Sequence, residues 1–146
     1  MLKIYQITCY LFLPIILLNL YFRIIYNKED KIRYSERFGR SNKYFKTSKK
    51  IIWLHAASIG EFKSCDLIIS KYYLNFHILV TTTTKTSAEY INQFYSDKVI
   101  HQYIPFDVPL WCSRFINYWK PNLVLWIESD IWPNMLKEFG ETLAFI

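Results

Sequence analysis

Hydrophobic positions at the start of the sequence form one continuous run. From Ile4 to Phe22 no side chain is charged, and most of the residues are apolar. As a helix, this run would extend about 28 Å, close to the roughly 30 Å hydrocarbon core of a bilayer. We therefore predict a hydrophobic membrane anchor over residues 1–23. Because one proline and two amide side chains interrupt the run, an interfacial helix is the main alternative; a cleaved signal peptide fits less well.

After residue 50 the pattern changes to short apolar runs that alternate with helix-like stretches. The apolar runs are rich in β-branched and aromatic residues and cover residues 51–56, 76–83, 99–104 and 122–127. Their nearly continuous apolarity is typical of strands that are buried on both faces. The stretches between them have helical character and cover residues 61–72, 86–95 and 109–119. This alternation predicts βαβ units and a doubly wound parallel sheet.

A fifth unit follows the same rhythm, with a helix at 131–139 and a strand in the final TLAFI sequence. We therefore expect an α/β fold in which the anchor (1–23) and a basic juxtamembrane segment (24–50) precede a Rossmann-like parallel-sheet domain (51–146). The sequence stops inside a predicted strand. We expect the domain to be incomplete there and to continue in a longer parent protein.

Positive charge is concentrated next to the anchor. Residues 23–50 hold ten Lys/Arg and three acidic residues, a net charge of +7, whereas residues 51–146 have a net charge of −2. Such a basic flank is typical of the cytoplasmic side of a membrane helix and binds anionic lipid headgroups. Nucleic acid is not an expected partner, because the predicted domain itself is acidic.

Ligands of open α/β sheets bind beyond the carboxyl ends of the strands, so candidate chemistry is sought directly after each strand. Carboxylates follow three of the four main strands: Glu61, Asp107, and the pair Glu128 and Asp130. Four threonines with a lysine, residues 81–85, follow the remaining strand. These threonines suit a strand end better than a phosphate-binding loop, because the glycines of a phosphate-binding motif are absent.

Two interpretations of Glu61 remain open at this point. The Ser58-x-x-Glu61 spacing matches a capping box, in which serine and glutamate bind the first amides of a helix. Alternatively, Gly60 allows a substrate to approach the backbone, and Glu61 faces the crevice as a general base. Glu128 and Asp130 have a similar alternative, with Asp130 as the N-cap of the next helix.

The three histidines and three cysteines do not show the spacing of a metal site. His55, His77 and His101 lie inside predicted strands, where a core or edge position is the more common role. The cysteines are odd in number and far apart, so we expect reduced and mostly buried thiols. No metal or cofactor is predicted.

Several motifs together resemble the amino-terminal half of the 3-deoxy-D-manno-octulosonic acid (Kdo) transferases of lipopolysaccharide synthesis, glycosyltransferase family 30. These motifs, in the family's order, are RYSERFG (33–39), IWLHAASIGE (52–61), ILVTTTTKT (78–86), YIPFDVP (103–109) and RFINYWKPNLVLWIESDIWPN (114–134). The resemblance implies an inverting glycosyltransferase with a GT-B fold of two Rossmann-like halves. It also implies the inner membrane, at its cytoplasmic face, as the location.

The resemblance also implies roles for individual residues. Glu61 closes the HxxSxGE motif and would be the proton acceptor for a hydroxyl of the lipid A precursor (lipid IVA), with CMP-Kdo as the donor. Glu128 would stabilise the transition state, and Ser58, Gly60 and Asp130 would contact substrate. Asp130 is shorter than the family's usual glutamate, and Ser87 replaces its commoner glycine.

The resemblance further implies that the donor site lies in the carboxyl-terminal half of the family. This chain alone is therefore expected to be inactive. Two other functions remain open from the residues: a non-catalytic, membrane-anchored α/β interaction module, and a flavodoxin-like nucleotide binder.

Overall fold

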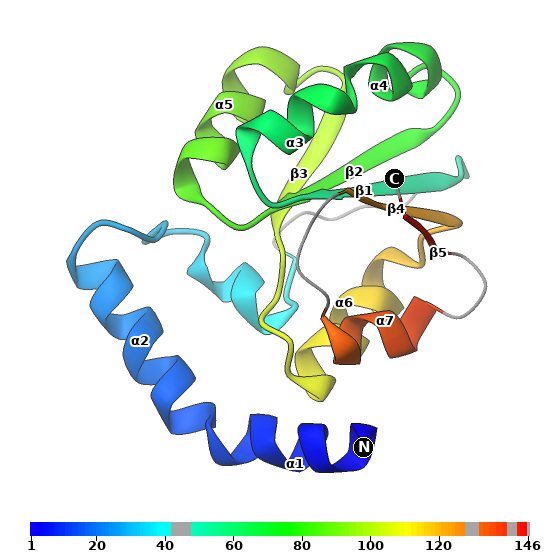
Figure 1. Ribbon diagram of the computed structural model, residues 1–146. Helices are drawn as coiled ribbons and strands as arrows, with labels where there is room; N and C mark the ends of the chain where they lie inside the picture. The colour runs from blue at the N-terminus through cyan, green and yellow to red at the C-terminus, as the bar shows by residue number, and fades with distance from the viewer. Residues whose placement is uncertain (42–47, 128–131, 140–142, 146) are drawn as a thin grey trace.

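The computed structural model describes residues 1–41, 48–127, 132–139 and 143–145, and its centre is a parallel β-sheet (Figure 1). Five strands lie in the order β3-β2-β1-β4-β5. Their bounds are β1 (Ile51–Ala56), β2 (His77–Thr82), β3 (Val99–Tyr103), β4 (Leu123–Ile127) and β5 (Leu143–Phe145). The predicted α/β fold with a parallel sheet is thus confirmed. The strand order reverses between β1 and β4, where α/β proteins usually bind ligands.

Helices cover both faces of the sheet, as a doubly wound arrangement requires. One face carries α3 (Ile59–Ser64), α4 (Asp66–Tyr72) and α5 (Lys85–Tyr95), and the other carries α6 (Pro109–Trp119) and α7 (Pro133–Phe139) (Figure 1). The single helix expected over 61–72 is instead two short helices that meet at Cys65. Pro109 lies in the first turn of α6, where its missing N–H costs no helical hydrogen bond.

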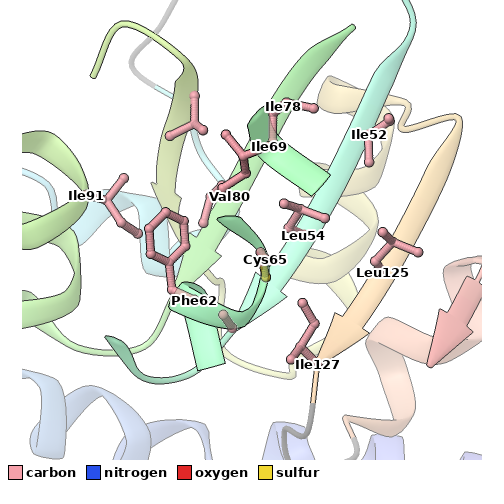
Figure 2. Close-up of a cluster of buried hydrophobic side chains, with 12 residues drawn as sticks. Ile52, Leu54, Phe62, Cys65, Ile69, Ile78, Val80, Ile91, Leu125 and Ile127 are labelled. Carbon is pink, nitrogen blue, oxygen red and sulfur yellow. The ribbon is translucent and has the colours of Figure 1, made fainter. Parts of the chain in front are cut away.

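Two apolar clusters hold the layers together. Successive residues of a strand point to opposite faces of the sheet. Because helices cover both faces, all six residues of β1 are buried. Figure 2 shows the cluster beneath α3, α4 and α5, where Leu54 and Val80 from the strands meet Phe62 and Ile69. On the other face the ring centroid of Trp53 lies 4.8 Å from that of Phe115 and 5.1 Å from that of Phe139.

The cysteines conform to the sequence prediction. Cys65 and Cys112 are buried, and all three thiols are free. Burial raises the pKa of the Cys65 thiol to about 11, so it remains protonated at neutral pH.

The N-terminal run forms two helices rather than the single one expected. Helices α1 (Leu2–Leu11) and α2 (Leu13–Ile25) meet at a bend of 54°. Pro14 lies in the first turn of α2, where its ring is incompatible with a helix continuing from α1. Among the described residues, neither helix has the length and apolarity to cross a membrane by itself, although the bent pair does by length and composition.

Part of the basic segment packs against the sheet domain. A short 3₁₀ helix, η1 (Tyr34–Phe38), contacts β3 and α6. Gly39 ends it with a positive φ of +69°, a conformation that favours glycine. A Cβ atom at Gly39 would collide with the carbonyl oxygen of Trp111.

Replacing Gly39 with alanine is expected to destabilise the chain. The left-handed backbone costs about 1–2 kcal/mol for an L residue, and the collision with Trp111 adds to this cost. Urea unfolding followed by tryptophan fluorescence measures the loss. The matched control is Gly60→Ala, because the nearest atom to a Cβ there is Ser58 Oγ at 3.8 Å. Equal stability of the two variants would contradict the prediction.

His55 is a core histidine, as its position in a predicted strand indicated. Its Nδ1 lies 2.9 Å from Thr81 Oγ1, which also accepts a hydrogen bond of 2.8 Å from Trp53 Nε1. Its ring centroid lies 4.2 Å from that of Trp126. Burial lowers the pKa of His55 from 6.5 to about 3, so the ring is neutral in the folded chain.

This neutral histidine predicts a loss of stability in mild acid. Below pH 6.5 the unfolded chain protonates His55, whereas the folded chain does so only near pH 3. The free energy of unfolding should therefore fall by about 1.4 kcal/mol per pH unit from this residue between those values. Urea unfolding at pH 7 and pH 5 measures the slope. The slope should be smaller in His55→Phe, and an unchanged slope would refute the assignment.

Candidate functional site

The loops that follow β1, β2 and β3 come together at the carboxyl edge of the sheet. The hydroxyl of Thr83, just after β2, donates to the carbonyl oxygen of Ala57, just after β1, at 2.8 Å. The Ile104 N–H, just after β3, donates to the carbonyl oxygen of Thr82 at 3.1 Å. This edge includes the reversal point between β1 and β4. Glu128 and Asp130, which follow β4, lie outside the described residues, so their roles stay predictions.

The capping box predicted for Ser58 and Glu61 is present in a modified form, in which Glu61 binds the amide of Ala57 instead of that of the N-cap. Ser58 is the N-cap of α3, and its Oγ accepts the Glu61 N–H at 3.2 Å. In return the Ser58 hydroxyl donates to Glu61 Oε1 at 3.0 Å. The other carboxylate oxygen, Oε2, accepts the N–H of Ala57 at 2.7 Å, one residue before the N-cap. Two hydrogen bonds therefore fix the direction of the Glu61 carboxylate.

The same contacts place Glu61 at the sheet's carboxyl edge. Ala57 directly follows β1, so a carboxylate bound to its N–H lies where that strand ends. Glu61 is half-buried, while Ser58 and Gly60 are exposed beside it. The capping role and a position at the ligand edge are therefore compatible in this geometry.

Gly60 has no positive φ, so its backbone conformation does not require glycine. In the described part of the chain, the nearest atom to a Cβ there is Ser58 Oγ, at 3.8 Å. The absence of a side chain leaves the first turn of α3 open beside the Glu61 cap.

The threonines at the end of β2 and just after it have structural roles. Thr81 and Thr82 are buried in the last residues of the strand. Thr84 is the N-cap of α5 and accepts the Ser87 N–H at 3.2 Å. The Ser87 hydroxyl lies 2.7 Å from that of Thr84, so Ser87 belongs to this cap.

Asp107, the carboxylate after β3, caps a helix that is distant in sequence. It accepts the N–H groups of Asn134 at 3.1 Å and Met135 at 2.9 Å, in the first turn of α7. It also accepts the hydroxyl of Tyr5 from α1 at 2.8 Å. Burial and the neighbouring Asp107 raise the pKa of Tyr5 well above its usual range. Asp107 thus attaches the first apolar helix to the carboxyl edge of the sheet.

A buried ion pair contacts the residues at this edge and was not predicted from the sequence. Arg37 Nη2 lies 2.9 Å from Glu29 Oε1, and both side chains are nearly inaccessible to solvent. Arg37 also donates to the carbonyl oxygens of Ile104, at 3.2 Å, and Thr83. Burial lowers the pKa of Arg37 while Glu29 opposes this effect, and arginine remains charged. Arg37 is therefore not available to lipid headgroups.

Arg33 forms a second ion pair, in which Glu36 is buried and Arg33 is half-buried. It binds Glu36 through two hydrogen bonds of 2.9 Å, and Glu36 Oε2 accepts the backbone N–H of Tyr103 at 2.7 Å. Both guanidinium groups lie over the Tyr103 ring. The ring centroid is 4.9 Å from Arg33 Cζ and 4.8 Å from Arg37 Cζ. The signal in the sequence was the presence of glutamates inside an otherwise basic segment.

Within the described ranges, no three His, Cys, Asp or Glu side chains are grouped so that they could hold a metal ion.

Comparisons with known proteins bear on this geometry. Residues 32–143 match the family described as 3-deoxy-D-manno-octulosonic-acid transferase (kdotransferase). A 3-deoxy-D-manno-octulosonic acid transferase of Rickettsia bellii is 35% identical over 141 residues, which are 94% of this chain and 34% of the relative. A probable mitochondrial 3-deoxy-D-manno-octulosonic acid transferase of Arabidopsis thaliana is 33% identical over 92% of this chain and 30% of its own length.

A 3-deoxy-D-manno-octulosonic acid transferase of Haemophilus influenzae is 31% identical over 118 residues, 78% of this chain and 28% of the relative. The chain thus spans about a third of the length of the curated relatives it matches. The family match includes the segment that carries Arg37, the Glu61 cap and all five strands except the end of β5. The chain therefore belongs to the Kdo transferase family.

Proposed function

We propose that this chain supplies the acceptor side of an inverting glycosyltransferase that transfers Kdo from CMP-Kdo to a lipid A precursor. Membership of the Kdo transferase family supports this reaction class. The position of the Glu61 carboxylate also supports it, because Ala57 and Ser58 hold this carboxylate at the carboxyl end of β1.

In the proposed reaction, Glu61 takes the proton from a hydroxyl group of the acceptor. The hydroxyl oxygen then forms a bond to the anomeric carbon of Kdo, while the bond from that carbon to CMP breaks and the configuration inverts. A carboxylate can accept about four hydrogen bonds, so its contacts to Ala57 and Ser58 are compatible with a contact to substrate. Those contacts fix the base before substrate arrives, which avoids reorganisation during the reaction.

The remaining site residues have supporting roles. The reacting sugar passes through a state resembling an oxocarbenium ion, and Glu128 is proposed to stabilise its positive charge. Ser58 and Gly60 are proposed to contact the acceptor, since both are exposed beside Glu61. Asp130 is proposed as a further substrate contact. The donor site is proposed to lie in a second Rossmann-like half, as a GT-B architecture requires.

Replacing Glu61 with glutamine is expected to lower turnover about 10²-fold or more, because the amide cannot accept the proton. The assay uses a chimera in which this whole chain, including Glu29 and Arg37, replaces the matching segment of the Rickettsia bellii relative, with CMP-Kdo and lipid IVA as substrates. The control is Glu89→Gln, an exposed glutamate on α5 that should leave turnover unchanged.

If the Glu61→Gln chimera keeps most of the turnover, Glu61 is not the proton acceptor. It would favour a non-catalytic interaction module that keeps Glu61 only as a helix cap.

We further propose that α1 and α2 bind the cytoplasmic face of the inner membrane and bring the site to its lipid substrate. Most apolar side chains of this pair are exposed, while the hydrogen bond from Tyr5 to Asp107 ties α1 to the carboxyl edge. Lys28 and Lys31 are exposed just after α2, where they are positioned to contact anionic headgroups.

Replacing Ile7 with aspartate is expected to weaken binding of the chain to anionic phospholipid vesicles at least about tenfold, because the carboxylate must enter the apolar region. Flotation with vesicles measures the bound fraction. Leu67→Asp is the matched control, since Leu67 on α4 is also exposed, at 83% against 68% for Ile7. Equal weakening by both substitutions would contradict the assignment of the membrane face to α1.

A further inference from the structure

A continuous path of hydrogen bonds connects the buried ion pair with the Glu61 carboxylate. Arg37, held by Glu29, donates to the carbonyl oxygen of Thr83. The hydroxyl of Thr83 donates to the carbonyl oxygen of Ala57 at 2.8 Å. The N–H of Ala57 in turn donates to Glu61 Oε2 at 2.7 Å.

We propose that Thr83 is a positioning residue for Glu61. Its hydroxyl holds the start of the β1–α3 connection, which includes the N–H that orients the Glu61 carboxylate. This inference rests on the proposed function, because Thr83 acts on the reaction only through Glu61. It adds to that function a residue from the loop after β2, which contacts neither the carboxylate nor the α3 cap directly.

The position of Thr83 in the sheet explains why a side chain has this role. His55 and Thr81 are the last paired residues of β1 and β2 in the parallel register, and Ala57 and Thr83 lie two residues beyond them along the chain. At this point the strands separate into different helices, and the backbone ladder no longer links them. The Thr83 hydroxyl supplies a cross-strand bond where the ladder has ended.

Thr83 is itself held on both sides. Arg37 binds its carbonyl oxygen, and the next residue, Thr84, is the N-cap of α5. These contacts restrict the backbone of Thr83 and keep its hydroxyl directed at Ala57. Loss of the hydroxyl would release the connection between β1 and the cap of α3, and displacement of a reacting group by about 1 Å can cost 10²-fold in rate.

The experiment measures kcat and the acceptor KM in the same chimera with the Rickettsia bellii relative. Thr83→Val keeps the size of the side chain and removes the donor, whereas Thr83→Ser keeps the donor. Thr83→Ala is the second variant that lacks the hydroxyl, for use if valine prevents folding. Thr86→Val is the control, because Thr86 is exposed and its hydroxyl reaches Thr84 rather than Ala57.

We expect Thr83→Val to lower kcat about tenfold with an acceptor KM changed less than about twofold, since a misplaced base affects the transition state. Serine should restore most of the rate, and Thr86→Val should have no effect. In the chain itself, amide hydrogen exchange at Ala57 should become faster in Thr83→Val. This measurement reports the loosening of Ala57 independently of activity.

A kcat within about twofold of the unchanged chimera, or a rise in acceptor KM alone, would overturn the inference provided that Glu61→Gln still abolishes turnover. Unchanged exchange at Ala57 would overturn it as well. If Glu61→Gln remains active, the proposed function fails and the inference fails with it. The Glu61 variant thus separates the two failures.

Discussion

The buried pair of Glu29 and Arg37 is the contact on which the carboxyl edge of the sheet depends. A guanidinium group removed from water carries a large desolvation cost, which only a carboxylate and well-placed acceptors can offset. Arg37 has both, because Glu29 binds it at 2.9 Å and the carbonyl oxygens of Thr83 and Ile104 accept further hydrogen bonds from it. Loss of one partner from such a pair typically costs about 3–5 kcal/mol. The segment before the sheet is therefore part of the site's framework.

This framework is compatible with the proposed double role of Glu61 as helix cap and catalytic base. Glu61 belongs to a short helix of six residues, which alone would hold a side chain poorly. Its carboxylate is instead oriented by the N–H of Ala57. Thr83 binds the carbonyl oxygen of Ala57, and Arg37 binds the carbonyl oxygen of Thr83. On the other side, Asp107 joins the first turn of α7 and Tyr5 of α1. The same edge thus connects the candidate base with the apolar helices proposed to contact the membrane.

The sequence predicted the features that depend on local patterns. The runs of β-branched residues identified the strands because both faces of a central strand are buried, and the Ser58–Glu61 spacing identified the capping box because its partners are three residues apart. Arg37 could not be assigned in this way, since its carbonyl partners are 46 and 67 residues away. Likewise, Asp107 was found as a strand-end carboxylate, but its binding to α7 depends on tertiary packing. The break between α1 and α2 was indicated only by Pro14.

We propose that Glu61 binds an acceptor hydroxyl while it remains in its helix cap. The most direct measurement is a crystal structure of the chimera with a bound acceptor analogue that retains the reacting hydroxyl. We predict that the hydroxyl oxygen lies within about 3.2 Å of a Glu61 carboxylate oxygen, with the contacts to Ala57 and Ser58 kept. An acceptor bound at the carboxyl edge with its hydroxyl directed to another residue, and Glu61 contacting only its cap, would contradict the account.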